Sequence, residues 1–348
     1  MGRKLLWASL VLAPITLLLR FVFDAGDTTL FLVSAVSLVP LAWLIGEATE
    51  HAAAHTGPGI GGFLNATFGN APELIIALFA VSDGLTEVVR GSLTGSVVGN
   101  LLLVLGFSLA FGGRGELDRE SSFVSLGLVA LATVLFLIPA VPAWTGDPER
   151  HSIAVLSVPV ACVLLVVYSG VTWLSLRRHR RLHVSAEPAD SAAWSLPLAL
   201  GVLTAATVVT AFVAEILVHS LETFAERAHL SDFFVAAVIV AIVGNAAEHG
   251  GAVVVAYRGR IKLAAEIALA SSAQVAVFLI PAVALLALVI EPLALSFRPI
   301  EILALGGSTA VAAVLLWDGR STRTRGLALI GMYVVMAAAF FLVGDRNP

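Results

Sequence analysis

Two short motifs place carboxylates inside long apolar segments of the chain. In the first motif Asn70 and Glu73 are three residues apart, so in a helix their side chains lie on one face. In the second motif Asn245 and Glu248 repeat that spacing. Within a membrane a carboxylate costs at least about 2.5–3.5 kcal/mol on insertion scales, so its presence indicates a function. These four side chains are therefore the first candidates for binding a charged substrate.

The two motifs offer only oxygen ligands. Two carboxylates and two amide oxygens near the membrane midplane would form a doubly negative site, which hard cations prefer, and Ca²⁺ takes roughly 6–8 oxygens. Thiolates and clustered imidazoles are missing from the motifs, which argues against zinc or copper as the substrate. The same site would bind protons, because two carboxylates placed together raise the pKa of at least one of them. Protonation would expel the metal ion, so a cation and protons could exchange through one pair of glutamates.

Residues next to the motifs could complete the coordination. Gly69 and Gly244 directly precede the two asparagines, and Pro72 removes one backbone donor, so loosened helix turns would free carbonyl oxygens there. The helices that follow add further side-chain oxygens, from Ser96, Asn100, Ser271, Ser272 and Gln274. For the serines close helix packing is an alternative interpretation, because small residues also let helices approach each other.

A second set of ionisable residues could relay cations or protons. Glu47 and Glu50 lie near the end of the second apolar segment, and Glu215 lies well inside the seventh. His249 adjoins Glu248 and titrates near neutral pH if it is unperturbed, so it could tune a proton step. The alternatives are solvated charges at helix ends for the glutamates and a hydrogen-bonded buried imidazole for His249.

The elements that must position these residues are membrane helices. Of the 348 residues 59% are hydrophobic and 13% are charged, against roughly 45–50% and about 25% in soluble proteins. One cysteine, Cys162, excludes a disulfide framework, and a net charge of −4 argues against a nucleic-acid partner. The apolar runs are far longer than the roughly 9–11 residues of a membrane barrel strand. We therefore predict an all-α polytopic membrane protein whose partner is the lipid bilayer.

About eleven segments approach the roughly 20 apolar residues that a transmembrane helix needs. They are residues 4–23, 28–50, 60–82, 86–111, 121–142, 152–176, 195–220, 232–257, 261–290, 297–317 and 325–344. The segment 261–290 is longer than one span needs, so we expect a tilt or a kink at Pro281.

The two motifs also reveal an internal repeat. The asparagines differ by 245 − 70 = 175 and the glutamates by 248 − 73 = 175, and Ser96 and Ser271 share this offset. The predicted organisation is an extra N-terminal transmembrane helix (1–27), a first five-helix repeat (28–176), a basic cytoplasmic linker (177–194) and a second repeat (195–348). An odd number of spans inverts the second copy, an architecture typical of secondary transporters.

The distribution of Lys and Arg predicts the orientation. With the N-terminus in the cytoplasm, 14 of the 20 basic residues fall on the inside and 6 on the outside. The positive-inside rule thus predicts a cytoplasmic N-terminus and an outside C-terminus. The small size and short termini favour a prokaryotic plasma (inner) membrane. No P-loop pattern is present, so we expect neither ATP-driven transport nor enzymatic activity, and no cofactor besides the transported ions.

Longer stretches around both motifs resemble one family of ion exchangers. Residues 61–80 and 91–106 closely resemble the first repeat motif of the calcium/proton exchangers of the cation/Ca²⁺ exchanger superfamily. Residues 244–249 and 271–274 resemble the second repeat motif. The basic linker departs from the family, because several relatives carry an acidic helix there.

This resemblance implies exchange of Ca²⁺ for H⁺ by alternating access. It implies that Glu73 and Glu248 are the calcium ligands and proton carriers. It assigns supporting roles at the site to Asn70, Asn245, Ser96 and Gln274, and roles in cation entry or proton relay to Glu50 and Glu215. The carboxylates alone leave a Na⁺/H⁺ or K⁺/H⁺ antiporter as the alternative. An intramembrane metalloprotease would need a His-Glu-x-x-His pattern, which the sequence lacks.

Overall fold

The computed structural model describes residues 2–182 and 194–346, and these residues form two compact units. The first unit comprises Met1–Phe79, Val166–Phe224 and Val243–Ala247. The second comprises Ala80–Leu165, Ala225–Ile242 and Glu248–Pro348. Each unit therefore combines segments from the first and the second half of the chain.

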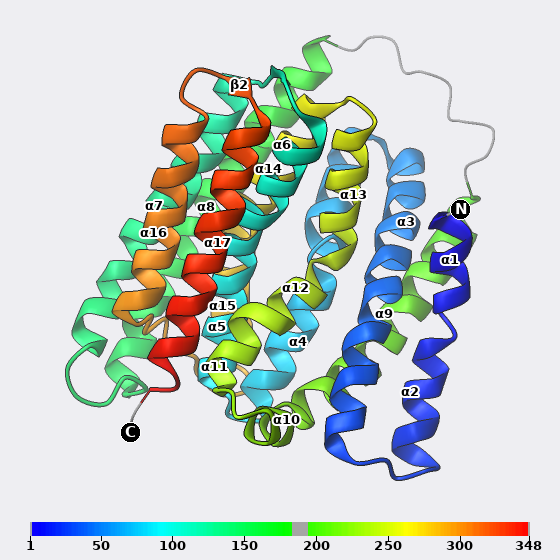
Figure 1. Ribbon diagram of the computed structural model, residues 1–348, viewed down its shortest axis with the longest axis vertical. Coiled ribbons are helices and arrows are strands. Elements are labelled where there is room, and N and C mark those ends of the chain that lie inside the picture. Colours follow the sequence, from blue (N-terminus) through cyan, green and yellow to red (C-terminus); the bar gives the residue numbers. More distant parts are fainter. Residues whose placement is uncertain (1, 183–193, 347–348) are drawn as a thin grey trace. The chain divides into compact units, whose positions relative to one another are not determined.

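The described residues are almost entirely helical (Figure 1). The first half contains α1 (Gly2–Ser9), α2 (Leu12–Phe21), α3 (Asp27–Phe68), α4 (Ala71–Ser82), α5 (Thr86–Val98), the π-helix η1 (Gly99–Val104), α6 (Leu105–Gly112), β1 (Gly115–Glu116), α7 (Arg119–Ala143) and α8 (His151–Leu182). The second half contains α9 (Leu196–His219), α10 (Leu221–Ala228), α11 (Asp232–Phe234), the π-helix η2 (Val235–Val240), α12 (Ala241–Gly244), α13 (Ala246–Tyr257), α14 (Ile261–Gln274), the π-helix η3 (Val275–Leu279), α15 (Ile280–Ala287), α16 (Pro299–Leu315), β2 (Arg320–Ser321) and α17 (Arg323–Val343).

The first unit is organised by the packing of α3 along α9. Small and branched side chains meet there: Ile45 and Ala48 of α3 are buried against Leu203 and Ala206 of α9. The beginning of α4 joins the same cluster through Ala71. The N-terminal half of the long helix α3 thereby anchors the segment that carries the first motif.

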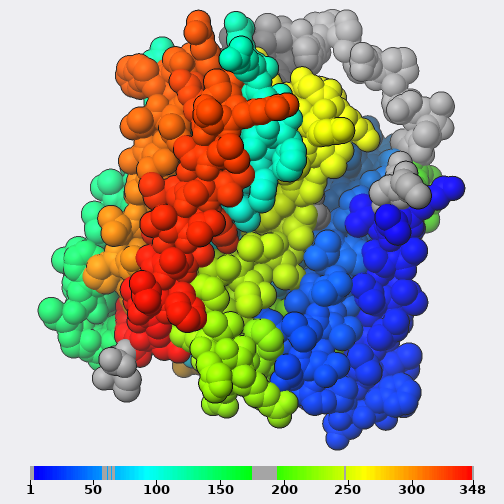
Figure 2. Space-filling model, viewed as in Figure 1, coloured from blue at the N-terminus to red at the C-terminus, as the bar shows by residue number. Residues whose placement is uncertain are grey.

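The second unit brings α17 close to α6, and Figure 2 shows α17 (red) beside α16 (orange) and α6 (turquoise). Glycine makes this approach possible, because a Cβ atom at Gly326 would lie 2.4 Å from the backbone nitrogen of Ala110. Two short strands, β1 and β2, pair antiparallel at the ends of these helices. On its other side α17 presents bare apolar residues, such as Leu342 with an exposed fraction of 81%, as expected of a helix facing lipid.

Among the described residues, eight helices are long and apolar enough to cross a membrane, or nine if the bent α10–α12 pair forms one span. The all-α prediction is confirmed, whereas the predicted number of eleven spans is not. Segment 60–82 is divided, because α3 continues to Phe68 and α4 has only 12 residues. Segment 232–257 is divided at Asn245, and α16 has 17 residues. The sequence count missed these breaks because hydropathy averages over them.

Candidate functional site

The first motif lies at a break between two helices. α3 ends at Phe68 and α4 begins at Ala71, so Gly69 and Asn70 form a turn inside an apolar stretch. Pro72 stands in the first turn of α4, where its missing N–H costs no helical hydrogen bond. The break is the loosened turn that the glycine and proline predict. Not every carbonyl there is open to a ligand, because the Asn70 carbonyl accepts the backbone N–H of Leu74 at 3.0 Å.

Glu73 follows in the first turn of α4, and it is buried with an exposed fraction of 7%. A carboxylate is favoured at this end of a helix, because the helix dipole is positive there. Within the first unit Glu73 lies against the second motif: a Cβ atom at Gly244 would be 3.2 Å from the Glu73 Cγ and 3.8 Å from its Oε1. A side chain at Gly244 would therefore press on the Glu73 side chain, which would have to shift by a few tenths of an ångström. Asn70 and Asn245 are equally buried, each at 1% exposure.

The second motif has a matching break at Asn245, and α13 begins at Ala246. Glu248 stands in the first turn of α13, as Glu73 does in α4. Within the second unit its Oε2 accepts a short hydrogen bond from the Ser271 hydroxyl of α14. The Asn100 side-chain amide in turn donates to the Ser271 Oγ at 3.0 Å. Three of the predicted site residues thus form one hydrogen-bonded chain, from the buried Asn100 and Ser271 to the half-buried Glu248.

Two further predicted residues lie next to π-helical turns. Ser96 of α5 is buried, and three residues later η1 begins and carries Asn100. Gln274 is half-buried and is the last residue of α14, directly before η3. η1 begins at Gly99 and η3 at Val275, and 275 − 99 = 176, so the two π-turns begin within one residue of the repeat offset of 175. Such turns are frequent at functional sites because they re-aim side chains and carbonyls.

The sequence analysis did not predict these π-turns, although Pro281 offers a signal for one of them. Proline cannot donate to a carbonyl of the preceding turn, so the helix ahead of it readily departs from α geometry. η3 occupies that position, immediately before α15, whose second residue is Pro281. The irregularity expected at this proline therefore lies in the turn before it.

The other ionisable candidates have different surroundings. Glu50 and Glu215 are exposed on α3 and α9, so the first unit does not bury them as it buries Glu73. Glu47 lies 3.5 Å from the His51 Nε2, one helical turn away. Within the part of the chain that the structure describes, the His249 Nε2 is buried and has no hydrogen-bond partner.

A metal ion at these motifs would need ligands other than clustered acids. Among residues 2–182 and 194–346, no group of three or more His, Cys, Asp or Glu could hold a metal ion. Amide, hydroxyl and main-chain oxygens would have to supply much of the coordination, and Ca²⁺ accepts such oxygens readily.

Sequence and structure comparisons place this arrangement among known transporters. The sequence pattern of the family "Sodium/calcium exchanger protein" matches residues 27–177 and 198–342. The chain is 38% identical to the Ca²⁺/H⁺ antiporter ChaA of Bacillus subtilis over 91% of this chain and 93% of that protein. It is 34% identical to a Ca²⁺/H⁺ antiporter of Aphanothece halophytica over 95% of each chain. The solved structure of native YfkE superposes with a TM-score of 0.82 at 35% identity, covering 98% of this chain and 100% of that one.

Proposed function

The chain belongs to the sodium/calcium exchanger protein family, in its calcium/proton exchanger branch, and from this premise we propose that it exchanges Ca²⁺ for H⁺ across a membrane. In this proposal Glu73 and Glu248 together bind either the cation or protons, and access to them alternates between the two sides. Ca²⁺ and H⁺ are substrates, so the exchange requires no cofactor. The names of the relatives support Ca²⁺ and H⁺ as the exchanged ions, and the buried Glu73 and half-buried Glu248 carboxylates support the mechanism.

The hydrogen-bonded chain from Asn100 through Ser271 to Glu248 is the observation that carries this proposal. Ser271, which donates to the carboxylate, and Asn100, which donates to Ser271, are both neutral, so Glu248 can hold a proton without breaking an ion pair to either. The Ser271 oxygen and the Asn100 amide oxygen can also turn toward a cation, because hydroxyl and amide groups are good ligands for Ca²⁺. One set of side chains can therefore stabilise a protonated glutamate and a calcium-bound one in turn.

The direction of transport is set by the ion gradients across the membrane. From the Lys and Arg distribution we propose a cytoplasmic N-terminus. The membrane is proposed to be a prokaryotic plasma membrane. A proton gradient directed into the cell would then drive Ca²⁺ outward. Asn70, Asn245, Ser96 and Gln274 are proposed to supply oxygens at the site, and Glu50 and Glu215, exposed on α3 and α9, are proposed to guide cations toward it.

The experiment is Ca²⁺ uptake by the purified protein in liposomes under an imposed pH gradient. Wild-type protein should take up Ca²⁺ in proportion to the gradient, whereas Glu73→Gln and Glu248→Gln should abolish uptake. Glu120→Gln, on α7 and exposed, is the matched control and should behave as wild type. Undiminished uptake by either glutamine variant would remove that glutamate from the mechanism.

Sodium and potassium serve as the competing ions in the same liposomes. Proton efflux driven by Na⁺ or K⁺, with no response to Ca²⁺, would replace the calcium assignment by the monovalent alternative. A current that does not depend on any counter-ion gradient would contradict exchange altogether.

A further inference from the structure

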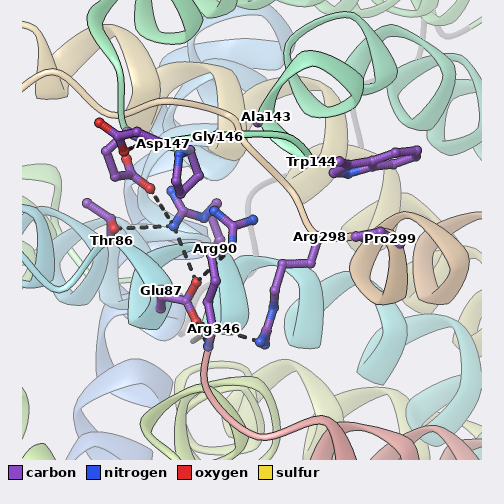
Figure 3. Close-up of a pocket in the computed structure, with 12 residues that line it drawn as sticks. Thr86, Glu87, Arg90, Ala143, Trp144, Gly146, Asp147, Arg298, Pro299 and Arg346 are labelled. Atoms are coloured by element: carbon purple, nitrogen blue, oxygen red, sulfur yellow. Dashed lines mark hydrogen bonds and ion pairs between the residues drawn. The ribbon is translucent and has the colours of Figure 1, made fainter. Parts of the chain in front are cut away.

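A cavity of about 920 Å³ opens at one end of the second unit, away from both motifs in the sequence. Figure 3 shows the side chains around it. They come from the start of α5, the loop between α7 and α8, the start of α16 and the residues after α17. Its polar lining includes Glu87, Arg90, Glu149, Arg298 and Arg346.

Arg90 is the best-satisfied cation in this cavity. It is 2% exposed, and its Nη2 lies 2.7 Å from the Glu149 carboxylate. The same guanidinium donates to the Ala294 carbonyl and to the Thr86 hydroxyl, each at 3.2 Å. Arg90 therefore needs no further partner and holds the wall of the cavity together.

Arg298 is buried to the same degree but is less well paired. It is 6% exposed, and its Nη1 donates to the Gly344 carbonyl at 2.8 Å. Its contacts with the Glu87 and Glu301 carboxylates are 3.7 and 3.8 Å long. Charge-assisted hydrogen bonds are about 2.7–2.9 Å long, so these contacts are ion pairs without a hydrogen bond. Within the described part of the chain, its buried Nε and Nη2 atoms have no hydrogen-bond partner.

Arg346 also contributes a hydrogen-bond donor without an acceptor to this cavity, within the described residues. Its Nη2 donates to the Ser296 carbonyl at 2.7 Å, and its Nε lies 3.4 Å from Glu87. Among the described residues, no acceptor meets its buried Nη1. Burial and the neighbouring Arg90 charge lower the pKa of the Arg346 guanidinium, against the opposing effect of Glu87, Glu301 and Glu149.

The carboxylates in and beside the cavity are shared among several donors. Glu87 is shared among three guanidiniums, those of Arg90, Arg298 and Arg346. Glu301 accepts the backbone N–H of Arg298 at 2.8 Å and the Thr94 hydroxyl at 3.3 Å. A buried donor without a hydrogen bond is destabilising, so an additional acceptor with several oxygens would be stabilising here.

We propose that this cavity binds a phosphate group through the unpaired guanidinium edges of Arg298 and Arg346. A phosphate presents several acceptor oxygens, and arginine forks match their geometry. The Phe233 ring, 3.8 Å from the Arg298 guanidinium carbon, holds the guanidinium plane and leaves its edges for the ligand. Such a site is separate from the glutamate motifs and is not part of the exchange chemistry.

Two sources could supply this phosphate: a phospholipid headgroup or free phosphate. The cavity lies at the ends of α5 and α17, at the level where membrane helices meet headgroups. Trp144 also lines it and is 42% exposed, as is typical of tryptophan at the membrane interface. Both sources share the same chemistry at the arginines, and the experiment separates them.

The test measures the unfolding temperature of delipidated protein in a phosphate-free detergent without Ca²⁺. One arm adds inorganic phosphate at constant ionic strength, and the other adds mixed micelles of phosphatidylglycerol or of a phosphate-free diacylglycerol. Ligand binding to the folded state raises the unfolding temperature, so the titration reports affinity. Arg346→Gln should weaken the response about tenfold, the usual loss for a hydrogen bond to a charged group.

Arg325→Gln is the matched control, because it removes an arginine from the opposite end of α17. It should respond as wild type, and Arg346→Lys should respond between wild type and Arg346→Gln.

A response to phosphate alone identifies free phosphate, and a response to phosphatidylglycerol alone identifies a headgroup; either supports the site. No response in wild type, an equal response to diacylglycerol, or an undiminished response in Arg346→Gln overturns the proposal. The Arg346 side chain is 20% exposed, so Arg346→Gln should fold. Arg346→Gln therefore tests the phosphate site even if Arg298→Gln does not fold.

Discussion

The two glutamates occupy different surroundings, although their motifs share the same spacing. Glu73, in the first unit, lies against the bare backbone of Gly244. Glu248, in the second unit, accepts a hydrogen bond from Ser271, which Asn100 supports. The missing side chain of Gly244 leaves room beside the Glu73 side chain, and at Glu248 the Ser271 hydroxyl donates to the carboxylate. The sequence repeat keeps each glutamate at the same position in its helix. Tertiary packing determines which groups lie next to it.

This difference predicts different sensitivities. The surroundings of Glu73 should respond to added volume, because a tightly packed interior cannot absorb extra methyl groups without shifting its neighbours. The surroundings of Glu248 should respond to the loss of a hydrogen bond, with little dependence on volume. The predictions below test this contrast, from the largest expected effect to the smallest.

Gly244→Val should reduce Ca²⁺/H⁺ exchange by about 10–100-fold, because overpacking costs about 1–3 kcal/mol. The valine Cβ would lie 3.2 Å from the Glu73 Cγ, and its methyl groups would come closer still. Initial uptake rates in proteoliposomes measure the effect. Gly250→Val is the control in the following helix, since nothing lies within 4 Å of a Cβ atom there, and it should keep wild-type rates. Equal losses in both variants would show that glycine serves the helix backbone rather than Glu73.

Ser271→Ala should reduce exchange about tenfold, because a hydrogen bond to a charged group contributes about 1.5–3 kcal/mol. Ser272→Ala provides a neighbouring control, since the Ser272 hydroxyl bonds to the Ala268 carbonyl of its own helix. Exchange rates and the apparent Ca²⁺ affinity of both variants should be compared. The contrast between the two glutamates fails if Ser272→Ala is as damaging as Ser271→Ala.

Asn100→Ala should have a smaller effect, a few-fold loss of exchange, because Asn100 acts on Glu248 through Ser271. If it is only a positioning residue, its loss should add little to that of Ser271→Ala, since coupled residues are not additive. The double variant Asn100→Ala/Ser271→Ala measures this. Fully multiplicative losses would instead indicate that Asn100 contacts the substrate.

Asp318, a carboxylate outside the membrane-spanning helices, is the residue whose substitution should affect exchange least. Hydrogen bonding from Arg325 lowers the pKa of Asp318 from 3.8 to about 2. Because the folded-state pKa is the lower one, the stabilisation is present above pH 3.8 and is lost as the pH falls toward 2. Asp318→Asn should therefore leave exchange at neutral pH unchanged and slightly flatten the acid limb of the unfolding curve. A loss of exchange comparable to Ser271→Ala would mean that this ion pair acts beyond its own loop.

Several features of this protein could be read from the residues before any fold was known. Hydropathy predicted an all-α membrane protein, and the motif residues predicted the calcium/proton exchanger family; the fold and the comparisons confirm both. The Gly-Asn pairs predicted loosened turns, and helix breaks lie at Asn70 and Asn245. These features are local, because they depend on side-chain type and on spacing along one helix.

Other features required the tertiary structure. The predicted count of eleven spans is not confirmed among the described residues, because averaging the hydropathy hides the breaks beside the motifs. Glu215 was a relay candidate owing to its apolar neighbours in sequence, yet its helix turns it to an exposed face. No sequence signal indicated that Arg298 and Arg346 would share a cavity, since these residues belong to different segments.

The sequence by itself determined the positions of the carboxylates, the helix breaks and the apolar segments. These features depend on the helical period and on the cost of burying a charge, and both act among residues close together in the chain. Only the tertiary structure decided that Gly244 adjoins Glu73 and that Asn100 reaches Ser271, a residue 171 positions away. Contacts between such distant residues follow from the packing of whole helices, which is a property of all their side chains together. The identical spacing in both motifs therefore says where each glutamate stands, and the packing says which group completes its surroundings.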